Sequence, residues 1–161
     1  SGMQLADLDE IDLLAGIIEQ SGADPKTVKL EITESLMMEN PDHAANALKK
    51  LKALGILLAI DDFGTGYSSL SYLHQFPLDT LKIDRSFVVN MDKSESSNRI
   101  VRSIVQLALA LEMDIIAEGI EEKTQMDALR ELGCQYGQGY YMSRPLAQDQ
   151  ILELIESRPT W

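Results

Sequence analysis

Two adjacent carboxylates in this sequence stand where a predicted strand ends. The apolar run at residues 56–60 leads directly into Asp61 and Asp62. Two acids at the carboxyl end of a buried strand are costly unless a cation or hydrogen bonds compensate their charge. The pair therefore has two interpretations: a helix cap with a salt-bridged neighbour, or a site for a divalent cation.

Polar residues recur at the same point of the other predicted strands. Because the carboxyl ends of parallel strands form the rim at which sheets and barrels bind ligands, residues in these positions are expected to converge. Packing alone is a poor explanation for such a set, so we interpret it as one functional site. Its oxygen ligands favour Mg²⁺ or Mn²⁺ over a histidine-rich zinc centre. The set is Glu31, Asp61, Asp62, Lys82, Asp84, Glu118 and Gln138.

Strand and helix patterns alternate along the chain that must position these residues. Alternating or continuous apolar segments predict strands at about 28–33, 56–62, 80–84, 114–119 and 136–141. Apolar residues at helical spacing predict helices at about 5–20, 41–54, 95–111, 123–132 and 147–156, and a short helix before Pro77. This alternation predicts an α/β fold of parallel βα units.

Strand periodicity also predicts directions for the side chains. In the third strand Lys82 and Asp84 lie on the face opposite Leu81 and Ile83. Adjacent residues of a regular strand point to opposite faces, so Asp61 and Asp62 are expected to diverge as long as the strand continues. We therefore expect Asp62 at the last position of its strand or just beyond it.

Composition limits the classes of partner. The 161 residues suffice for one domain, and the net charge of −12 argues against polymeric nucleic acid. A phosphorylated small molecule remains compatible, because bound cations reverse the local field. No apolar run approaches the roughly 18 residues of a membrane span, so no direct membrane insertion is expected. The single Cys134 and the absence of a signal-peptide pattern predict a cytoplasmic location, alone or as the cytoplasmic part of a membrane-attached signalling protein.

Several long segments, in this order and spacing, resemble the successive motifs of EAL domains, which hydrolyse the bacterial second messenger cyclic di-GMP. The resemblance implies a TIM-like (β/α)₈ barrel with one antiparallel strand. It also implies hydrolysis of a cyclic dinucleotide substrate to the linear dinucleotide. The segments are Leu30-Glu31-Ile32-Thr33-Glu34-Ser35, Asp61-Asp62-Phe63-Gly64-Thr65-Gly66-Tyr67-Ser68-Ser69-Leu70, Leu81-Lys82-Ile83-Asp84, Ala117-Glu118-Gly119 and Gln138-Gly139-Tyr140.

Carried over by position, the resemblance implies a two-metal site for Mg²⁺ or Mn²⁺. Glu31 and Asp61 would be metal ligands, with Asp61 bridging two ions and Asp62 serving the second. Glu118 would belong to the same cluster. Two cations can polarise a phosphodiester and lower the pKa of a shared water, so the implied ligands suit the implied reaction.

The resemblance also implies roles for three further residues. Lys82 would orient or activate the attacking water, although a salt bridge to Asp84 or another neighbouring acid is an alternative. Gln138 would position water or metal, although a backbone hydrogen bond in a glycine-rich turn would look the same. Glu34 would anchor a mobile loop, although it could be a capping acid. That loop comprises Phe63, Gly64, Thr65, Gly66, Tyr67, Ser68 and Ser69.

The chain is shorter than the implied fold. A TIM barrel takes about 250 residues, and the pattern gives about five of eight strands, a partial barrel. Residues 1–161 are therefore expected to be the C-terminal part of a single EAL-type domain, without the N-terminal part that carries the Glu-Ala-Leu motif and an asparagine ligand in this family. Such a fragment exposes an unpaired edge, so we expect a homodimer, an exchanged strand or a companion segment to cover it. Alone it is expected to be inactive.

Two other functions remain open. A degenerate EAL module would bind cyclic di-GMP or a protein partner without turnover. Another Mg²⁺-dependent barrel enzyme, such as an enolase-type lyase, would use Lys82 as a base.

Overall fold

The computed structural model describes residues 8–66 and 70–161. Within them, five strands form one sheet in the order in which they occur in the chain, and every neighbouring pair is parallel. The predicted α/β architecture, five parallel strands of a partial TIM-like barrel, is confirmed. The strands are β1 (Lys29–Thr33), β2 (Leu57–Phe63), β3 (Thr80–Ile83), β4 (Asp114–Glu118) and β5 (Tyr136–Gln138).

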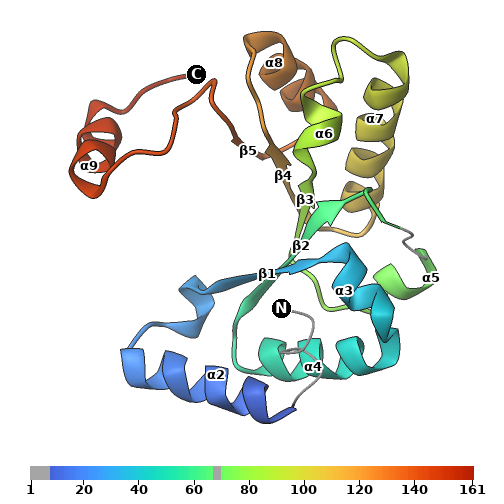
Figure 1. The fold of residues 1–161 in the computed structure, drawn as a ribbon, viewed down its shortest axis with the longest axis vertical. Helices are drawn as coiled ribbons and strands as arrows, with labels where there is room; N and C mark the ends of the chain where they lie inside the picture. The colour runs from blue at the N-terminus through green and yellow to red at the C-terminus, as the bar shows by residue number, and fades with distance from the viewer. Residues whose placement is uncertain (1–7, 67–69) are drawn as a thin grey trace.

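The helices between successive strands lie along one side of the sheet. Figure 1 shows α2 and α4 below the strands and α6, α7 and α8 at the upper right, with α9 extending to the left. The helices are α2 (Leu8–Ser21), α3 (Glu34–Glu39), α4 (Pro41–Ala53), α5 (Leu70–Leu73), α6 (Arg85–Val88), α7 (Glu95–Ala110), α8 (Lys123–Leu132) and α9 (Gln148–Ser157), and a 3₁₀ turn η1 covers Pro25–Thr27.

The differences from the predicted elements are short segments. The sequence patterns missed η1, α3 and α6, because one or two turns do not complete an apolar period. The strand predicted at 136–141 stops at Gln138. Conversely, β2 was predicted to end at Asp61 or Asp62 and continues to Phe63. The last difference changes the geometry of the candidate site.

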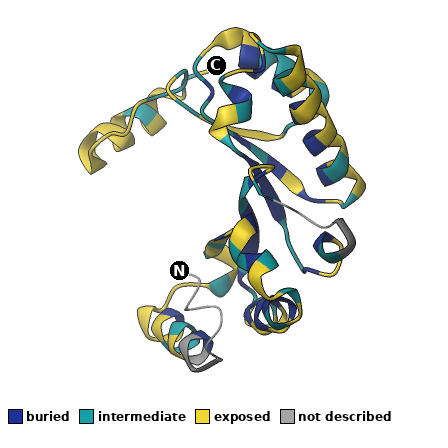
Figure 2. Cartoon of the chain, turned by 45° about the vertical axis from the view of Figure 1, so that its right-hand side comes forward, coloured by how far each residue is buried: buried dark blue, intermediate teal, exposed yellow. Residues whose placement is uncertain are grey.

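The hydrophobic core lies between the sheet and the helices that follow its strands. The outward residues of β2, β3 and β4 are fully buried, and they pack with the apolar faces of α4 and α7 in one cluster. Figure 2 shows this buried layer in dark blue along the central strands and the inner sides of these helices. The strand residues are Leu58, Ile60, Leu81, Ile83, Ile115 and Ala117, and the helical ones include Leu48, Leu51, Val101, Val105 and Ala108.

The opposite face of the sheet carries the polar residues of the candidate site among apolar ones, and it is exposed at both edge strands. Lys29, Glu31 and Tyr136 are exposed there. Lys29 Nζ donates to Thr80 Oγ1 at 2.9 Å, a contact that crosses this face from β1 to β3. In a parallel barrel this face points inward, so we call it the inner face. Among the described helices, none combines the length and the apolar character needed to cross a membrane.

Candidate metal and catalytic site

An irregularity in β2 brings its two acids together. The register of β2 against β3 shifts between Ile60 and Phe63, and Asp62 has a left-handed φ of 54°. Aspartate tolerates this conformation better than most residues, and a bulge redirects side chains locally. The expectation that Asp61 and Asp62 diverge while the strand continues is therefore wrong. One carboxylate oxygen each from Asp61, Asp62 and Glu118 lie within 4.8 Å of one another.

Lys82 lies at the centre of the inner face. Its Nζ is 2.7 Å from Glu31 Oε2, 3.0 Å from Asp61 Oδ1 and 2.7 Å from Glu118 Oε1. The residue is only 5% exposed. One ammonium on β3 thus bridges carboxylates from β1, β2 and β4.

The surroundings of Lys82 fix its protonation state. Burial by itself would lower the pKa of Lys82, but the hydrogen bonds from Glu118, Glu31 and Asp61 outweigh that effect and raise the pKa above its usual value. Lys82 is therefore an ammonium at neutral pH. It can donate hydrogen bonds and stabilise negative charge, but it is poorly suited to accept a proton as a base.

The acids exceed the positive charge that faces them. Burial raises the pKa of Asp62, the negative charges of Asp61 and Asp84 raise it further, and only Lys82 opposes the change. The cluster of Asp61, Asp62 and Glu118 offers oxygen ligands alone, which suits a hard divalent cation such as Mg²⁺ or Mn²⁺. A bound cation would compensate the repulsion between these groups.

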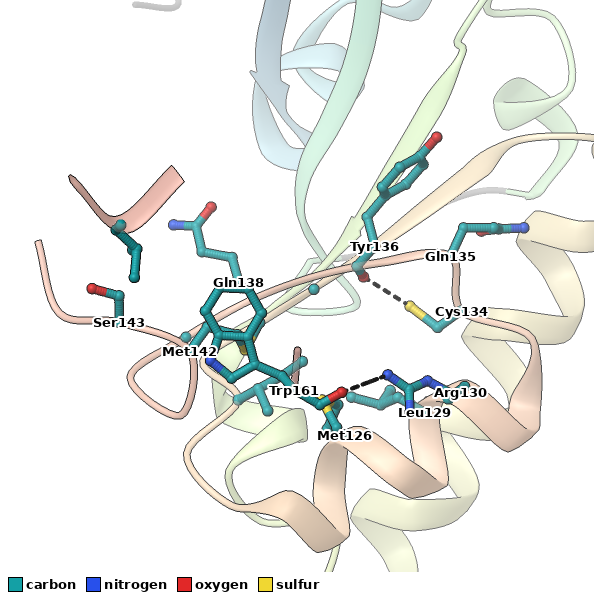
Figure 3. A pocket seen from close by; sticks show the side chains of 14 residues that line it. Met126, Leu129, Arg130, Cys134, Gln135, Tyr136, Gln138, Met142, Ser143 and Trp161 are labelled. Carbon is teal, nitrogen blue, oxygen red and sulfur yellow. Dashed lines mark hydrogen bonds between the residues drawn. The ribbon is translucent and has the colours of Figure 1, made fainter. Parts of the chain in front are cut away.

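Gln138 lies opposite Glu118 in the pairing of β4 with β5. Its carbonyl accepts a hydrogen bond from the Ile120 amide at 3.1 Å, so the backbone bond considered for the glycine-rich turn is present. Its side chain is exposed and borders two cavities, of about 620 Å³ and about 390 Å³. Figure 3 shows the larger one, where the side chains of Tyr136 and Gln138 point away from Leu129 and Arg130. The larger cavity thus lies beside the acid cluster, not on it.

Glu34 is 1% exposed at the start of α3 and contacts the segment after β2. Its Oε2 accepts a hydrogen bond from the Gly64 amide at 2.8 Å. A Cβ at Gly66 would lie 2.9 Å from Glu34 Oε1, so the glycine permits this close approach. Of the expected mobile loop, residues 63–66 are described, and Tyr67, Ser68 and Ser69 lie outside the described residues.

Asp84 belongs to the same rim but has a local role. It caps α6, where its Oδ1 accepts hydrogen bonds from the Ser86 amide, at 2.9 Å, and from the Ser86 hydroxyl. The salt bridge to a neighbouring acid considered for Lys82 is present, because Lys82 pairs with three other acids. Its pairing with Asp84 is not among the ion pairs of the described residues.

The sequence analysis assigned no role to a group of residues beside Gln138. Arg85, Tyr140 and Arg144 line the smaller cavity, and both guanidinium groups lie over the Tyr140 ring, at 5.9 Å and 4.5 Å from its centroid. Only their closeness in sequence to Asp84 and Gln138 could have pointed to them.

Comparison with known proteins gives a consistent result. The EAL domain family model matches residues 1–145. The cyclic di-GMP phosphodiesterase NbdA of Pseudomonas aeruginosa is 41% identical over 147 residues, which are 91% of this chain and 19% of that protein. The chain spans about a fifth of the length of the curated relatives it matches.

Solved structures extend the likeness to the fold. The PaMucR phosphodiesterase in complex with c-di-GMP has a TM-score of 0.90 at 38% identity, over 94% of this chain and 61% of that one. BlrP1 of Klebsiella pneumoniae, solved with manganese and c-di-GMP, has a TM-score of 0.78 at 34% identity, over 86% of this chain and 36% of that one. The family model covers most of the sequence and the motifs lie on one rim of the sheet. The chain therefore belongs to the EAL domain family.

Proposed function

We propose that this chain provides metal ligands and catalytic groups for hydrolysis of the phosphodiester bond of cyclic di-GMP to the linear dinucleotide. The observation that carries the proposal is the set of contacts around Lys82, whose ammonium lies within 3.0 Å of carboxylates from three strands. A second cluster, which shares Asp61 and Glu118 with the first and adds Asp62, is compact enough to hold a cation. The relatives named above are a phosphodiesterase and complexes with the same cyclic dinucleotide.

The ligand roles follow from the positions of the acids. Asp61, Asp62 and Glu118 would hold the cation, and Glu31, which bonds to Lys82, would complete a two-metal set. Bound Mg²⁺ or Mn²⁺ would polarise the phosphodiester and lower the pKa of a bound water. The manganese complex of BlrP1 supports this class of ion without deciding between the two metals.

The remaining residues act on water and on the substrate. Lys82 stays protonated, so it would orient the attacking water and stabilise charge on the phosphoryl oxygens by donating hydrogen bonds. Gln138, exposed beside Glu118, would position water or a ligand of the metal. Glu34 would anchor the loop through Gly64.

We also propose that the chain acts as the C-terminal part of one barrel domain, residues 1–161, whose inner face is covered by a companion segment or a second copy. Edge strands β1 and β5 leave the sheet open, and Glu31 and Gln138 at these edges are exposed. The solved relatives are longer than this chain, which supports a companion that supplies further strands. Alone, the chain would turn over cyclic di-GMP slowly or not at all.

The test is hydrolysis of cyclic di-GMP with Mn²⁺ by the longest protein that contains this chain, followed by chromatography of the linear product. We expect turnover that falls at least about a hundredfold in Lys82→Met, because the variant loses a charged donor in the site. Glu131→Gln, an exposed change on α8, is the matched control and should retain activity.

Two results would contradict the proposal. Tight binding of cyclic di-GMP with no turnover under any divalent cation would favour a degenerate binding module. Turnover of a carboxylate substrate, with none of cyclic di-GMP, would favour an enolase-type lyase, a reaction that the raised pKa of Lys82 disfavours.

A further inference from the structure

Arg85 joins three loops at the rim of the sheet. Its Nη2 lies 2.7 Å from Glu121 Oε1 in the loop after β4. Its guanidinium also lies over the ring of Tyr140, after β5. Arg85 itself begins α6, directly after β3. One side chain thus contacts the loops that follow Glu118 and Gln138.

The stem of Arg85 packs against the backbone that follows Glu118. A Cβ at Gly119 would lie 2.1 Å from Arg85 Cγ and 2.8 Å from Arg85 Cβ, so the arginine occupies the space that any other residue's side chain would need. Gly119 also has a left-handed φ of 72°, which glycine adopts without strain. The turn after Glu118 is therefore shaped around Arg85.

The same turn is bonded to the segment that carries Gln138. The Ile120 amide donates to the Gln138 carbonyl at 3.1 Å, and the Tyr141 amide donates to the Ile120 carbonyl at 3.0 Å. Gly139 allows this approach, because a Cβ there would lie 2.0 Å from the Ile120 oxygen. A displacement of the turn would therefore move both strand ends.

We propose that Arg85 is a positioning residue of the site. Its pairing with Glu121 and its packing on Gly119 hold the carboxylate of Glu118 where the cation cluster needs it. The bonds through Ile120 extend this constraint to Gln138. The inference rests on the proposed function, because only there do Glu118 and Gln138 have roles.

The test compares Arg85→Met with Arg99→Met. Methionine keeps an apolar stem over Gly119 and removes the guanidinium. Arg99 provides the control, since it forms an exposed ion pair with Glu95 at 3.7 Å on α7, away from the rim. Hydrogen exchange of the Ile120 and Tyr141 amides, measured relative to Ile115 in β4, reports the turn without any need for activity. We expect exchange about threefold faster in Arg85→Met and unchanged in Arg99→Met, the size of effect that partly exposed ion pairs give.

A double-mutant cycle separates pairing from general packing. Glu121→Gln should accelerate the same amides, and the double variant should be no faster than Arg85→Met, because Arg85→Met already removes the ion pair with Glu121. Additive effects, or unchanged exchange in Arg85→Met, would overturn the proposal.

Mn²⁺-induced broadening of the Glu118 amide signal supplies the functional readout. The Mn²⁺ concentration needed for half-broadening should rise about threefold in Arg85→Met, in proportion to the lost pairing. An unchanged concentration would overturn the positioning role. Absence of broadening in the unsubstituted chain would contradict the proposed metal site instead, and the exchange rates would still decide the role of Arg85.

Discussion

The two faces of the same sheet use neighbouring residues for different purposes. On the outer face of β3, Leu81 and Ile83 are fully buried against helices. On the inner face of the same strand, Lys82 is almost equally buried, but among carboxylates. Alternation thus lets one strand contribute to the hydrophobic core and to a polar site, and burial alone does not tell the two apart.

The largest expected change in stability distinguishes the two faces of β2. Leu58→Ala removes a fully buried side chain from the core and should lower the free energy of unfolding by about 3 kcal/mol. Its neighbour Leu57 is only half-buried, so Leu57→Ala should cost about 1 kcal/mol or less. Denaturant unfolding of both variants measures the difference, and equal losses would contradict the assignment of the core to one face.

A smaller loss of stability is expected from a substitution on the inner face. Lys82→Met removes three charge-assisted hydrogen bonds and leaves the three carboxylates to repel one another. The free energy of unfolding should therefore fall by about 1.5 kcal/mol. Lys52→Met, which breaks a half-exposed ion pair with Asp79, should cost about 0.5 kcal/mol.

The stability lost in Lys82→Met should depend on pH in one direction. The pKa of Lys82 in the folded state is raised, so the Lys82 ammonium stabilises the folded chain. This stabilisation is complete at pH values below the ordinary lysine pKa of 10.5 and is lost as the pH rises through the folded-state pKa. The difference in stability between the unsubstituted chain and Lys82→Met should therefore be constant near neutral pH and shrink in strong alkali. A difference that shrinks below pH 9 would contradict this account.

The smallest expected effect has the opposite sign. The raised pKa of Asp62 means that its charge costs stability at neutral pH. Because the side chain is largely exposed and solvent screens the repulsion, Asp62→Asn should stabilise the metal-free chain by no more than about 0.5 kcal/mol. Asparagine also tolerates the left-handed φ of 54° at this position. The gain should vanish in acid, where Asp62 itself is protonated, and urea midpoints at neutral and acid pH measure it. Destabilisation at neutral pH would show that the repulsion is absent.

The sequence predicted the rim better than it predicted the geometry within it. Alternation assigned Glu31 and Lys82 each to one face of its strand, and Glu118 was expected at the end of another; in the structure the Lys82 ammonium contacts both carboxylates. The bulge in β2 depends on pairing with β3, which no local pattern of β2 encodes. For that reason the convergence of Asp61 and Asp62 could not be read from alternation.

The contacts of Arg85 were beyond sequence reasoning for a related physical reason. They join loops that are distant in sequence, and they depend on Gly119, whose missing Cβ leaves room for the Arg85 stem. Periodicity reports which face a residue occupies, whereas contacts between loops depend on how the strands end.

The measurement that tests the central claim most directly is Mn²⁺ binding by titration calorimetry at neutral pH. The chain carries a net charge of −12, so weak nonspecific binding must be separated from the site by matched variants. We expect saturable binding that persists in Glu131→Gln and is lost in Asp61→Asn, whose carboxylate belongs to both clusters. Equal binding by the two variants would mean that general negative charge, and not the inner face of the sheet, attracts the cation.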